Sequence, residues 1–145
     1  MTARGFDDAP LHRLLGIRAD QRGDGFVQYR VVPAPGSAGR ADGAVRAATD
    51  DGPGVSTFAI TTAVDIAVVD AVGTVINRRT VSMNGTAELN LTYVDAPHGE
   101  ATVRATVLHC GERVAAVEAR VTDARGTTIA FGRGTYSLRP GAEPS

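Results

Sequence analysis

Residues 56–72 (STFAITTAVDIAVVDAV) constrain the fold most, because they read as one long apolar helix and the residues after them read as strands. Ser56 or Thr57 can cap the helix, which leaves backbone N–H groups open at its start, and Gly73 can end it. A sheet with one apolar face must bury that face against another element, and this segment is the one long helix that the sequence predicts. We therefore expect an α+β fold with an antiparallel sheet wrapped around one long central helix. Apolar residues at helical spacing predict its buried face: Ile60, Ala63, Val64, Ala67, Val68 and Ala71.

The predicted strands alternate apolar and polar residues and are separated by turn residues. One strand precedes the helix, at 26–32, and ends at Pro33. On one face of the last strand, Ala130, Gly132 and Gly134 are small enough to let a packed helix approach closely. Four strands in all follow the helix and predict an antiparallel meander: 86–94, 101–109, 113–123 and 128–138.

The chain length of 145 residues fits one domain with a buried core. We place the core at 11–138 and expect flexible tails at 1–9 and 140–145. A minor helix is expected at 10–17, where a proline opens a short apolar turn and Gly16 closes it. Residues 33–54 are rich in Gly, Pro and small side chains, and they predict a long loop of the kind often used for binding.

Composition and charge exclude several classes of function. The chain is 43% hydrophobic and 21% charged, and no apolar run approaches the roughly 20 residues that span a bilayer. All 15 basic residues are arginine, which removes Schiff-base and P-loop lysine chemistry. With a net charge of -1 and dispersed arginines, nucleic acid is not an expected partner. The start MTARGFDDAP lacks a secretory pattern and Cys110 is the single cysteine, so we expect a cytoplasmic protein without an internal disulfide.

Asp65 lies in the middle of the apolar helix, where an isolated carboxylate needs an explanation. It shares a helix face with Thr61, Thr62 and Val69 at three- and four-residue spacing. Asp70 lies well around the helix near its end, so we expect Asp65 to be the inner of the two acids. The Asp65 carboxylate is either catalytic or structural. A structural one would bond to Thr61 or Thr62, or pair with an arginine across an interface.

Several segments carry a resemblance to a known family. An acid stands ten positions into a small-residue helix in STFAITTAVD, and an aromatic residue precedes a proline turn in AELNLTYVDAP. A Gly turn in LHCGER, a D-x-x-G turn in TDARG and the sequence IAFGRGTY follow. In order and spacing, the region from about Leu11 to Leu138 resembles the PaaI-like acyl-CoA thioesterases. The resemblance implies the hotdog fold, in which the sheet wraps the central helix.

The resemblance also implies roles for residues of the helix. Asp65 takes the place of the family's catalytic carboxylate, which activates water as a general base or attacks the thioester directly. The family commonly has His-Gly-Gly at the helix start, where this chain has Ser56, Thr57 and Phe58. A backbone N–H survives any substitution except proline, so Thr57 or Phe58 can still polarise the thioester carbonyl. The Phe58 side chain, however, would crowd a site that glycine leaves open.

Two pairs of polar residues after the helix are further candidates for binding substrate. Asn84 and Thr86 fall where the family often has a polar residue near the thioester, and a plain strand-start role is equally open. Arg78 and Arg79 could meet the phosphates of coenzyme A, although a solvated loop pair is the simpler explanation. The three histidines show no ligand spacing, so we expect no metal. The residues expected to bind substrate are Ser56, Thr61, Thr62, Val69, Asn84, Thr86, Arg78 and Arg79.

The distance between Thr57 and Asp65 along the helix predicts that two subunits assemble to form the site. Thr57 and Asp65 lie eight residues apart, or about 12 Å at a rise of about 1.5 Å per residue. Both cannot touch one thioester group, so a working site must combine the helix start of one subunit with Asp65 of another. We therefore expect a homodimer or a dimer-of-dimers tetramer, with no cofactor other than the coenzyme A of the substrate.

Two functions remain open at this point. The first is hydrolysis of an acyl-CoA or acyl-carrier thioester to the free acid and thiol, which the presence of Asp65 favours. The second is a non-catalytic hotdog dimer that binds an acyl or aromatic ligand or a protein partner, which the missing His-Gly-Gly favours. A hotdog dehydratase acting on hydroxyacyl thioesters fits less well, because that chemistry usually needs a histidine beside the acid.

Overall fold

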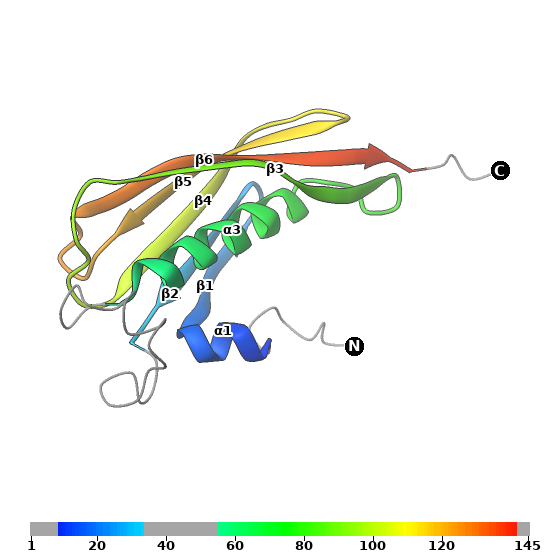
Figure 1. The fold of residues 1–145 in the computed structure, drawn as a ribbon. Coiled ribbons are helices and arrows are strands. Elements are labelled where there is room, and N and C mark those ends of the chain that lie inside the picture. Colours follow the sequence, from blue (N-terminus) through cyan, green and yellow to red (C-terminus); the bar gives the residue numbers. More distant parts are fainter. Residues whose placement is uncertain (1–8, 34–54, 142–145) are drawn as a thin grey trace.

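The computed structural model describes residues 9–33 and 55–141. The predicted loop at 33–54 and the predicted tails lie almost entirely outside these ranges. One long helix and six strands make up most of the described chain, with a short helix before them (Figure 1). In chain order the elements are α1 (Pro10–Leu15), β1 (Ile17–Gly23), β2 (Phe26–Val31), α3 (Thr57–Gly73), β3 (Val81–Tyr93), β4 (Ala101–Cys110), β5 (Val114–Thr122) and β6 (Thr128–Pro140).

The strands form one antiparallel sheet in the order β1-β2-β4-β5-β6-β3, and α3 lies across one of its faces (Figure 1). The expected four-strand meander is therefore wrong in one respect, since β3 pairs with β6 and not with β4. The connections explain this difference. Short loops at 111–113 and 123–127 make hairpins of β4, β5 and β6, whereas the longer segment 94–100 carries the chain away from β3.

Strand β1 was not predicted from the sequence. Of its seven residues (IRADQRG), only Ile17 is buried, so the strand lacks the apolar alternation that marks a half-buried strand. The pairing of Gly23 with Phe26 leaves a two-residue turn, Asp24–Gly25, in which Gly25 has a φ of 80°. An Asp-Gly pair between strands is a hairpin signal, and it is the one clue to β1 in the sequence.

The predicted buried face of the helix is confirmed. Its six residues, from Ile60 to Ala71, are fully buried against the sheet. At Gly134 on β6, an added Cβ would lie 2.6 Å from Val68 Cγ1, so glycine allows the close helix approach that we expected. Gly132 serves a different contact, because its missing Cβ would lie 1.9 Å from the backbone oxygen of Asn90 on β3.

Two strand ends differ from the prediction. Strand β3 begins at Val81, five residues before the predicted start, because register shifts between Met83 and Gly85 and between Thr86 and Glu88 disturb the alternation there. Strand β6 continues to Pro140, which we had placed in a tail. In the described part of the chain, no helix is long and apolar enough to cross a membrane.

Candidate active site

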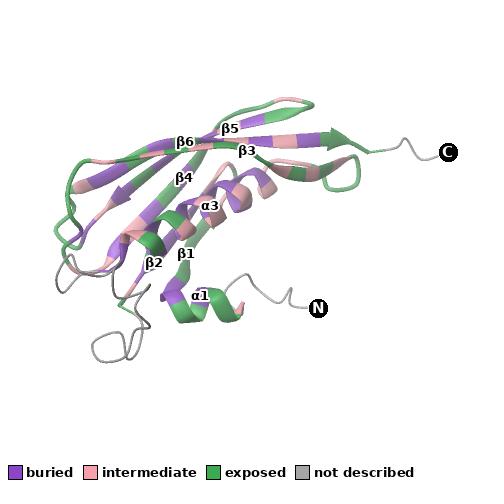
Figure 2. Cartoon of the chain, in the orientation of Figure 1, coloured by how far each residue is buried: buried purple, intermediate pink, exposed green. Residues whose placement is uncertain are grey.

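One face of α3 is not covered by the protein's own sheet. Residues on this face are intermediate or exposed, whereas other parts of α3 have the colour of buried residues (Figure 2). Phe58, with 54% of its surface exposed, lies at the start of this face. Ile66 and Val69 continue it as half-buried apolar residues, so the face is partly hydrophobic. The full stripe, which we call the open face of α3, is Phe58, Thr61, Thr62, Asp65, Ile66 and Val69.

Asp65 lies on the open face with few partners. Thr86 of β3 donates a hydrogen bond to Asp65 Oδ1 at 3.2 Å, so the structure brings these two predicted site residues together. The two threonines that a structural carboxylate was expected to use bond elsewhere. Thr62 Oγ1 donates to the Phe58 carbonyl at 2.9 Å, and Thr61 contacts Tyr93. No residue in 9–33 or 55–141 donates to Asp65 Oδ2, which leaves that oxygen open to water.

The expectation that Asp65 is the inner acid is wrong. Asp70 is the buried one, with 7% of its surface exposed, whereas Asp65 is half-buried. Arg22 makes an ion pair with Asp70 Oδ1, and the Tyr29 hydroxyl donates to Oδ2 at 3.1 Å. The sequence did not reveal these partners because Arg22 lies on the unpredicted strand β1. With both oxygens occupied, Asp70 is a structural carboxylate.

The start of α3 leaves two backbone donors free. Ser56 is the N-cap, and its hydroxyl accepts from the Ala59 N–H at 3.0 Å, while its carbonyl accepts from Ile60. The N–H groups of Thr57 and Phe58 have no acceptor among the described residues. Such groups at the positive end of a helix favour a partly negative oxygen. Ser56 thus has a capping role, which leaves Thr57 and Phe58 as the donors.

Tyr93, at the end of β3, is a further candidate residue that the sequence does not predict. Its hydroxyl donates to the Thr57 carbonyl oxygen at 2.9 Å and lies 2.8 Å from Thr61 Oγ1. Burial raises the pKa of Tyr93, although the hydrogen bond with Thr61 opposes that shift, so the phenol stays protonated at neutral pH. The signal in the sequence was the aromatic residue before the proline turn, but its partner lies 36 residues earlier.

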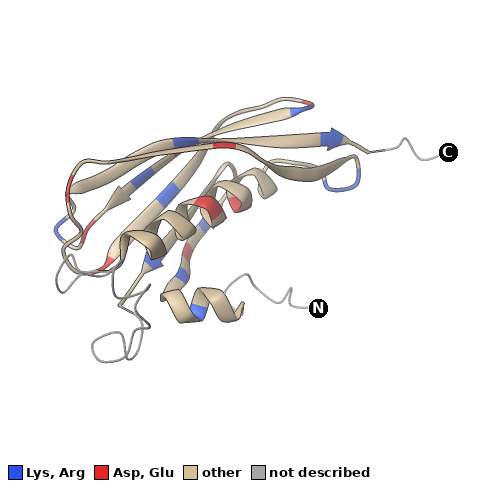
Figure 3. Ribbon diagram, in the orientation of Figure 1, with Lys and Arg blue, Asp and Glu red and all other residues tan. Residues whose placement is uncertain are grey.

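The structure does not bring every predicted residue to this place. Asn84 bonds to Ser137 at 3.2 Å and to Arg139 at 3.3 Å, on the face of the sheet away from α3. Arg78 and Arg79 are exposed beyond the other end of α3. An added Cβ at Gly73 would lie 2.7 Å from Arg78 Nη2 and 4.0 Å from Arg22 Nη2, so two guanidinium groups flank that helix end. Arginines are otherwise spread over several strands and loops (Figure 3).

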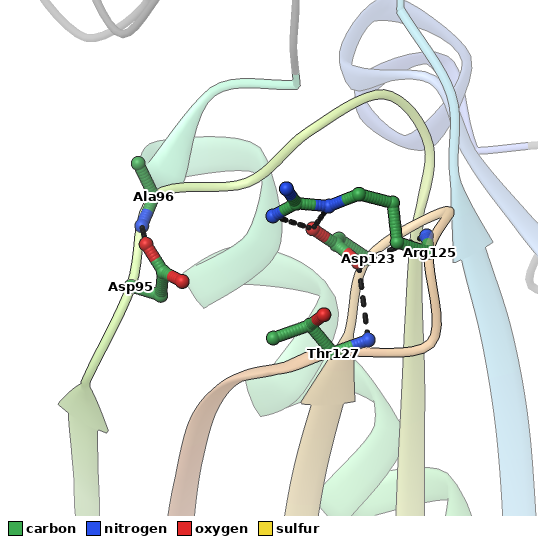
Figure 4. Close-up of polar contacts among 5 residues, drawn as sticks. All are labelled: Asp95, Ala96, Asp123, Arg125 and Thr127. Carbon is green, nitrogen blue, oxygen red and sulfur yellow. Dashed lines mark hydrogen bonds and ion pairs between the residues drawn. The ribbon is translucent and has the colours of Figure 1, made fainter.

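Asp123, in the turn between β5 and β6, is another buried acid, and its partners make it structural (Figure 4). It accepts from the backbone N–H groups of Arg125 at 2.9 Å and Thr127 at 3.2 Å. The Arg125 guanidinium adds two more bonds, at 3.1 and 3.0 Å. Burial alone would raise the pKa of Asp123, but these bonds and the Arg125 charge hold it below its usual range.

Comparison with known proteins gives structural relatives. Neither a protein-family model nor a curated protein sequence matches this chain. A mutant thioesterase from Staphylococcus aureus matches with a TM-score of 0.70 and 17% identity, over 91% of this chain and 100% of that one. A thioesterase from Haemophilus influenzae matches with a TM-score of 0.72 and 12% identity, over 92% and 85%. Zebrafish thioesterase superfamily member 2 matches with a TM-score of 0.68 and 23% identity, over 92% and 90%. The chain therefore has the hotdog fold of these thioesterases.

Proposed function

We propose that this protein is a PaaI-like thioesterase that hydrolyses an acyl-CoA or acyl-carrier thioester to the free acid and the thiol. The observation that carries the proposal is Asp65. It lies on the open face of α3, and among the described residues one of its oxygens accepts from Thr86 alone while the other has no donor. A carboxylate with a free oxygen on a partly apolar surface is suited to take a proton from water.

The proposed reaction uses backbone donors and this carboxylate. The N–H groups at Thr57 and Phe58 bind the thioester carbonyl oxygen and stabilise the charge that develops there. Asp65 takes a proton from a water molecule as the water oxygen adds to the carbonyl carbon. The resulting intermediate loses its C–S bond, and the proton passes from Asp65 to the departing sulfur. The products are the acid and the thiol.

A distance within α3 supports sharing of the site between two subunits. Thr57 and Asp65 are about 12 Å apart along α3 at a rise of about 1.5 Å per residue. The outer edge of β3, a strand of 13 residues at the end of the sheet, has no partner strand among the described residues. An unpaired edge of this length is a template for a second strand. Pairing of two copies along β3 would also cover the open face of α3.

The contacts of β3 with α3 suggest where the two-fold axis would pass. Thr86 lies level with Asp65, and Tyr93 lies level with Thr57 and Thr61, so β3 runs antiparallel to the helix. A two-fold axis near Leu89, midway between these contacts, would place Asp65 of one copy near the helix start of the other. Pairing of two copies along β3 is therefore compatible with a site that combines Asp65 of one copy with the helix start of the other.

Thiol release from short, medium, long and aromatic acyl-CoAs, measured for the wild type and Asp65→Asn, tests the function. We expect the variant to lose kcat by at least about a hundredfold, because asparagine keeps the shape and loses the base. Binding of a coenzyme A ester, measured by calorimetry, should change little. Hydrolysis that is undiminished in Asp65→Asn would refute the catalytic role of this residue.

A second candidate function has its own observation. The Phe58 ring is 54% exposed at the helix start, where the enzymes that the chain resembles commonly have glycine. A bulky ring there favours a hotdog dimer that holds an acyl or aromatic ligand, or a protein partner, without turning it over. No turnover of any thioester, combined with tight binding of coenzyme A esters by the folded protein, would support this alternative.

A further inference from the structure

Three hydroxyl and carbonyl groups at the start of α3 form a chain of hydrogen bonds. The Tyr93 phenol has one proton, and it donates that proton to the Thr57 carbonyl oxygen at 2.9 Å. The contact between Tyr93 Oη and Thr61 Oγ1, at 2.8 Å, must then have the threonine as donor. The order of donation therefore runs from Thr61 to Tyr93 and from Tyr93 to Thr57.

The last acceptor in this chain belongs to the same peptide group as a candidate substrate donor. The carbonyl of Thr57 and the N–H of Phe58 are the two ends of one planar, conjugated amide. A donor on the carbonyl oxygen draws electron density from the nitrogen and makes the N–H a stronger donor on the opposite side. The Phe58 N–H has no acceptor among the described residues, so the strengthened donor is left for a ligand.

We propose that Tyr93 is a positioning residue that orients and polarises the Thr57–Phe58 peptide, so that the Phe58 N–H binds the oxyanion formed from the substrate carbonyl. This inference rests on the proposed thioesterase function. Tyr93 touches neither the substrate nor the reacting water, and it acts through the peptide group alone. Thr61 contributes indirectly, because its hydroxyl supports the Tyr93 oxygen.

The strand that carries Tyr93 also contacts Asp65, which in the proposed dimer serves the second site. Thr86 bonds to Asp65, and Tyr93 bonds to the first turn of α3, and both lie on β3. A single strand therefore sets the position of the acid and of the backbone donor. The Tyr93 side chain is half-buried, and its raised pKa keeps the proton that the donation requires.

Kinetics of Tyr93→Phe test the role in turnover. Loss of a whole oxyanion donor costs about 10²–10³ in kcat, and loss of its polarisation alone should cost about tenfold, with KM changed less than about twofold. Tyr29→Phe is the matched control, because it removes a buried tyrosine hydroxyl that bonds to Asp70 near the opposite end of α3. We expect the control to lose stability and keep kcat. Equal values of kcat for Tyr93→Phe and the wild type, or equal losses in both variants, would overturn the inference.

Replacement of Tyr93 by 3-fluorotyrosine provides a second kinetic comparison. The more acidic phenol is a stronger donor to the Thr57 carbonyl, so we expect kcat at or above the wild-type value. A merely structural hydroxyl would respond to fluorination like any other small change in packing. A kcat as low as that of Tyr93→Phe would contradict polarisation through the peptide.

A measurement without substrate separates this inference from the proposed function. In the free protein, we expect Tyr93→Phe to shift the Phe58 amide proton upfield and to shift the Ala59 amide proton less, because Ala59 is bonded to Ser56. If no thioester is hydrolysed and the Phe58 resonance still moves, the thioesterase proposal fails and the polarised peptide stands. A Phe58 resonance that does not move would overturn the inference whatever the activity.

Discussion

Among the residues that the structure describes, three aspartates are buried or half-buried, and they differ in the number of donors that reach them. Asp123 accepts four hydrogen bonds from Arg125 and Thr127. Asp70 has Arg22 and Tyr29, one on each oxygen. Asp65 accepts from a single threonine hydroxyl in the part of the chain that the structure describes. A carboxylate whose oxygens are held by several donors is fixed in position, so Asp65, the least-bonded of the three, is the one with an oxygen left to bind a water molecule or a ligand.

The pKa of Asp123 makes the stability of the fold depend on pH. Because the folded pKa lies below its usual range, the charged form adds stability above the unfolded pKa of about 3.9. That contribution is lost as the pH falls from this value through the folded pKa. We expect Asp123→Asn to lower Tm at pH 7 and to lower it much less near pH 2, as measured by thermal denaturation. A difference in Tm that is the same at both pH values would contradict the assignment.

At the scale of elements, the contact between α3 and β6 depends on a missing side chain. In Gly134→Ala, the new Cβ would meet Val68 Cγ1 at 2.6 Å and Cγ2 at 2.9 Å. Gly134 does not have a positive φ, so the strain in the folded state comes from this steric contact and not from the backbone conformation. We expect a loss of about 1–3 kcal/mol in the free energy of unfolding, measured with urea.

A double-mutant cycle identifies the contact that causes this loss. Val68→Ala removes both close methyl groups, so Gly134→Ala should cost much less in that background. Val72→Ala is the matched control, since Val72 is equally buried on α3 and is not among the atoms closest to Gly134. We expect its effect to add to that of Gly134→Ala. Coupling to Val72 as strong as that to Val68 would contradict a local overpacking.

The elements that could be predicted from the sequence are those in which apolar or small residues repeat at the spacing of a helix or a strand. The helix repeat from Ile60 to Ala71 specified α3 and its buried face, and small residues on one face of β6 indicated where the helix would pack. Strand β1 has only Ile17 inside, so no pattern marked it. Because β1 is not predicted, Arg22 cannot be recognised as the ion-pair partner of Asp70, and the sequence wrongly favours Asp65 as the inner acid.

The candidate site was predictable only in part, because the sequence reveals residues that stand out within one element but not contacts between distant segments. Asp65 and Thr86 could be named because both stand out within their own elements, one by polarity and one by position. The role of Tyr93 could not be predicted, because it depends on a hydrogen bond to Thr57, 36 residues away in the sequence. The pairing of β3 with β6 and the place of Asn84 likewise depend on contacts between distant segments.

At the scale of the whole molecule, the shared site can be tested by mixing two inactive variants. Asp65→Asn lacks the carboxylate, and Phe58→Pro lacks one of the two N–H groups that would bind the carbonyl oxygen. Proline is tolerated in the first turn of a helix, so the second variant should keep α3. Each homodimer carries two broken sites. In the proposed arrangement, Asp65 of one subunit works with the helix start of the other, so a mixed dimer carries one site with both defects and one with neither.

Random mixing of equal amounts should restore about a quarter of the wild-type rate, since about half of the dimers are mixed and each has one of two sites intact. Both variants are first checked for cooperative thermal unfolding, and Thr57→Pro replaces Phe58→Pro if the latter does not fold. Thiol release is then measured before and after the subunits are mixed in mild denaturant and refolded. Recovery to this level would place Asp65 and its backbone donor in different subunits. Mixed dimers that form and remain as inactive as either parent would contradict the shared site, which we propose from the separation of about 12 Å between Thr57 and Asp65 along α3.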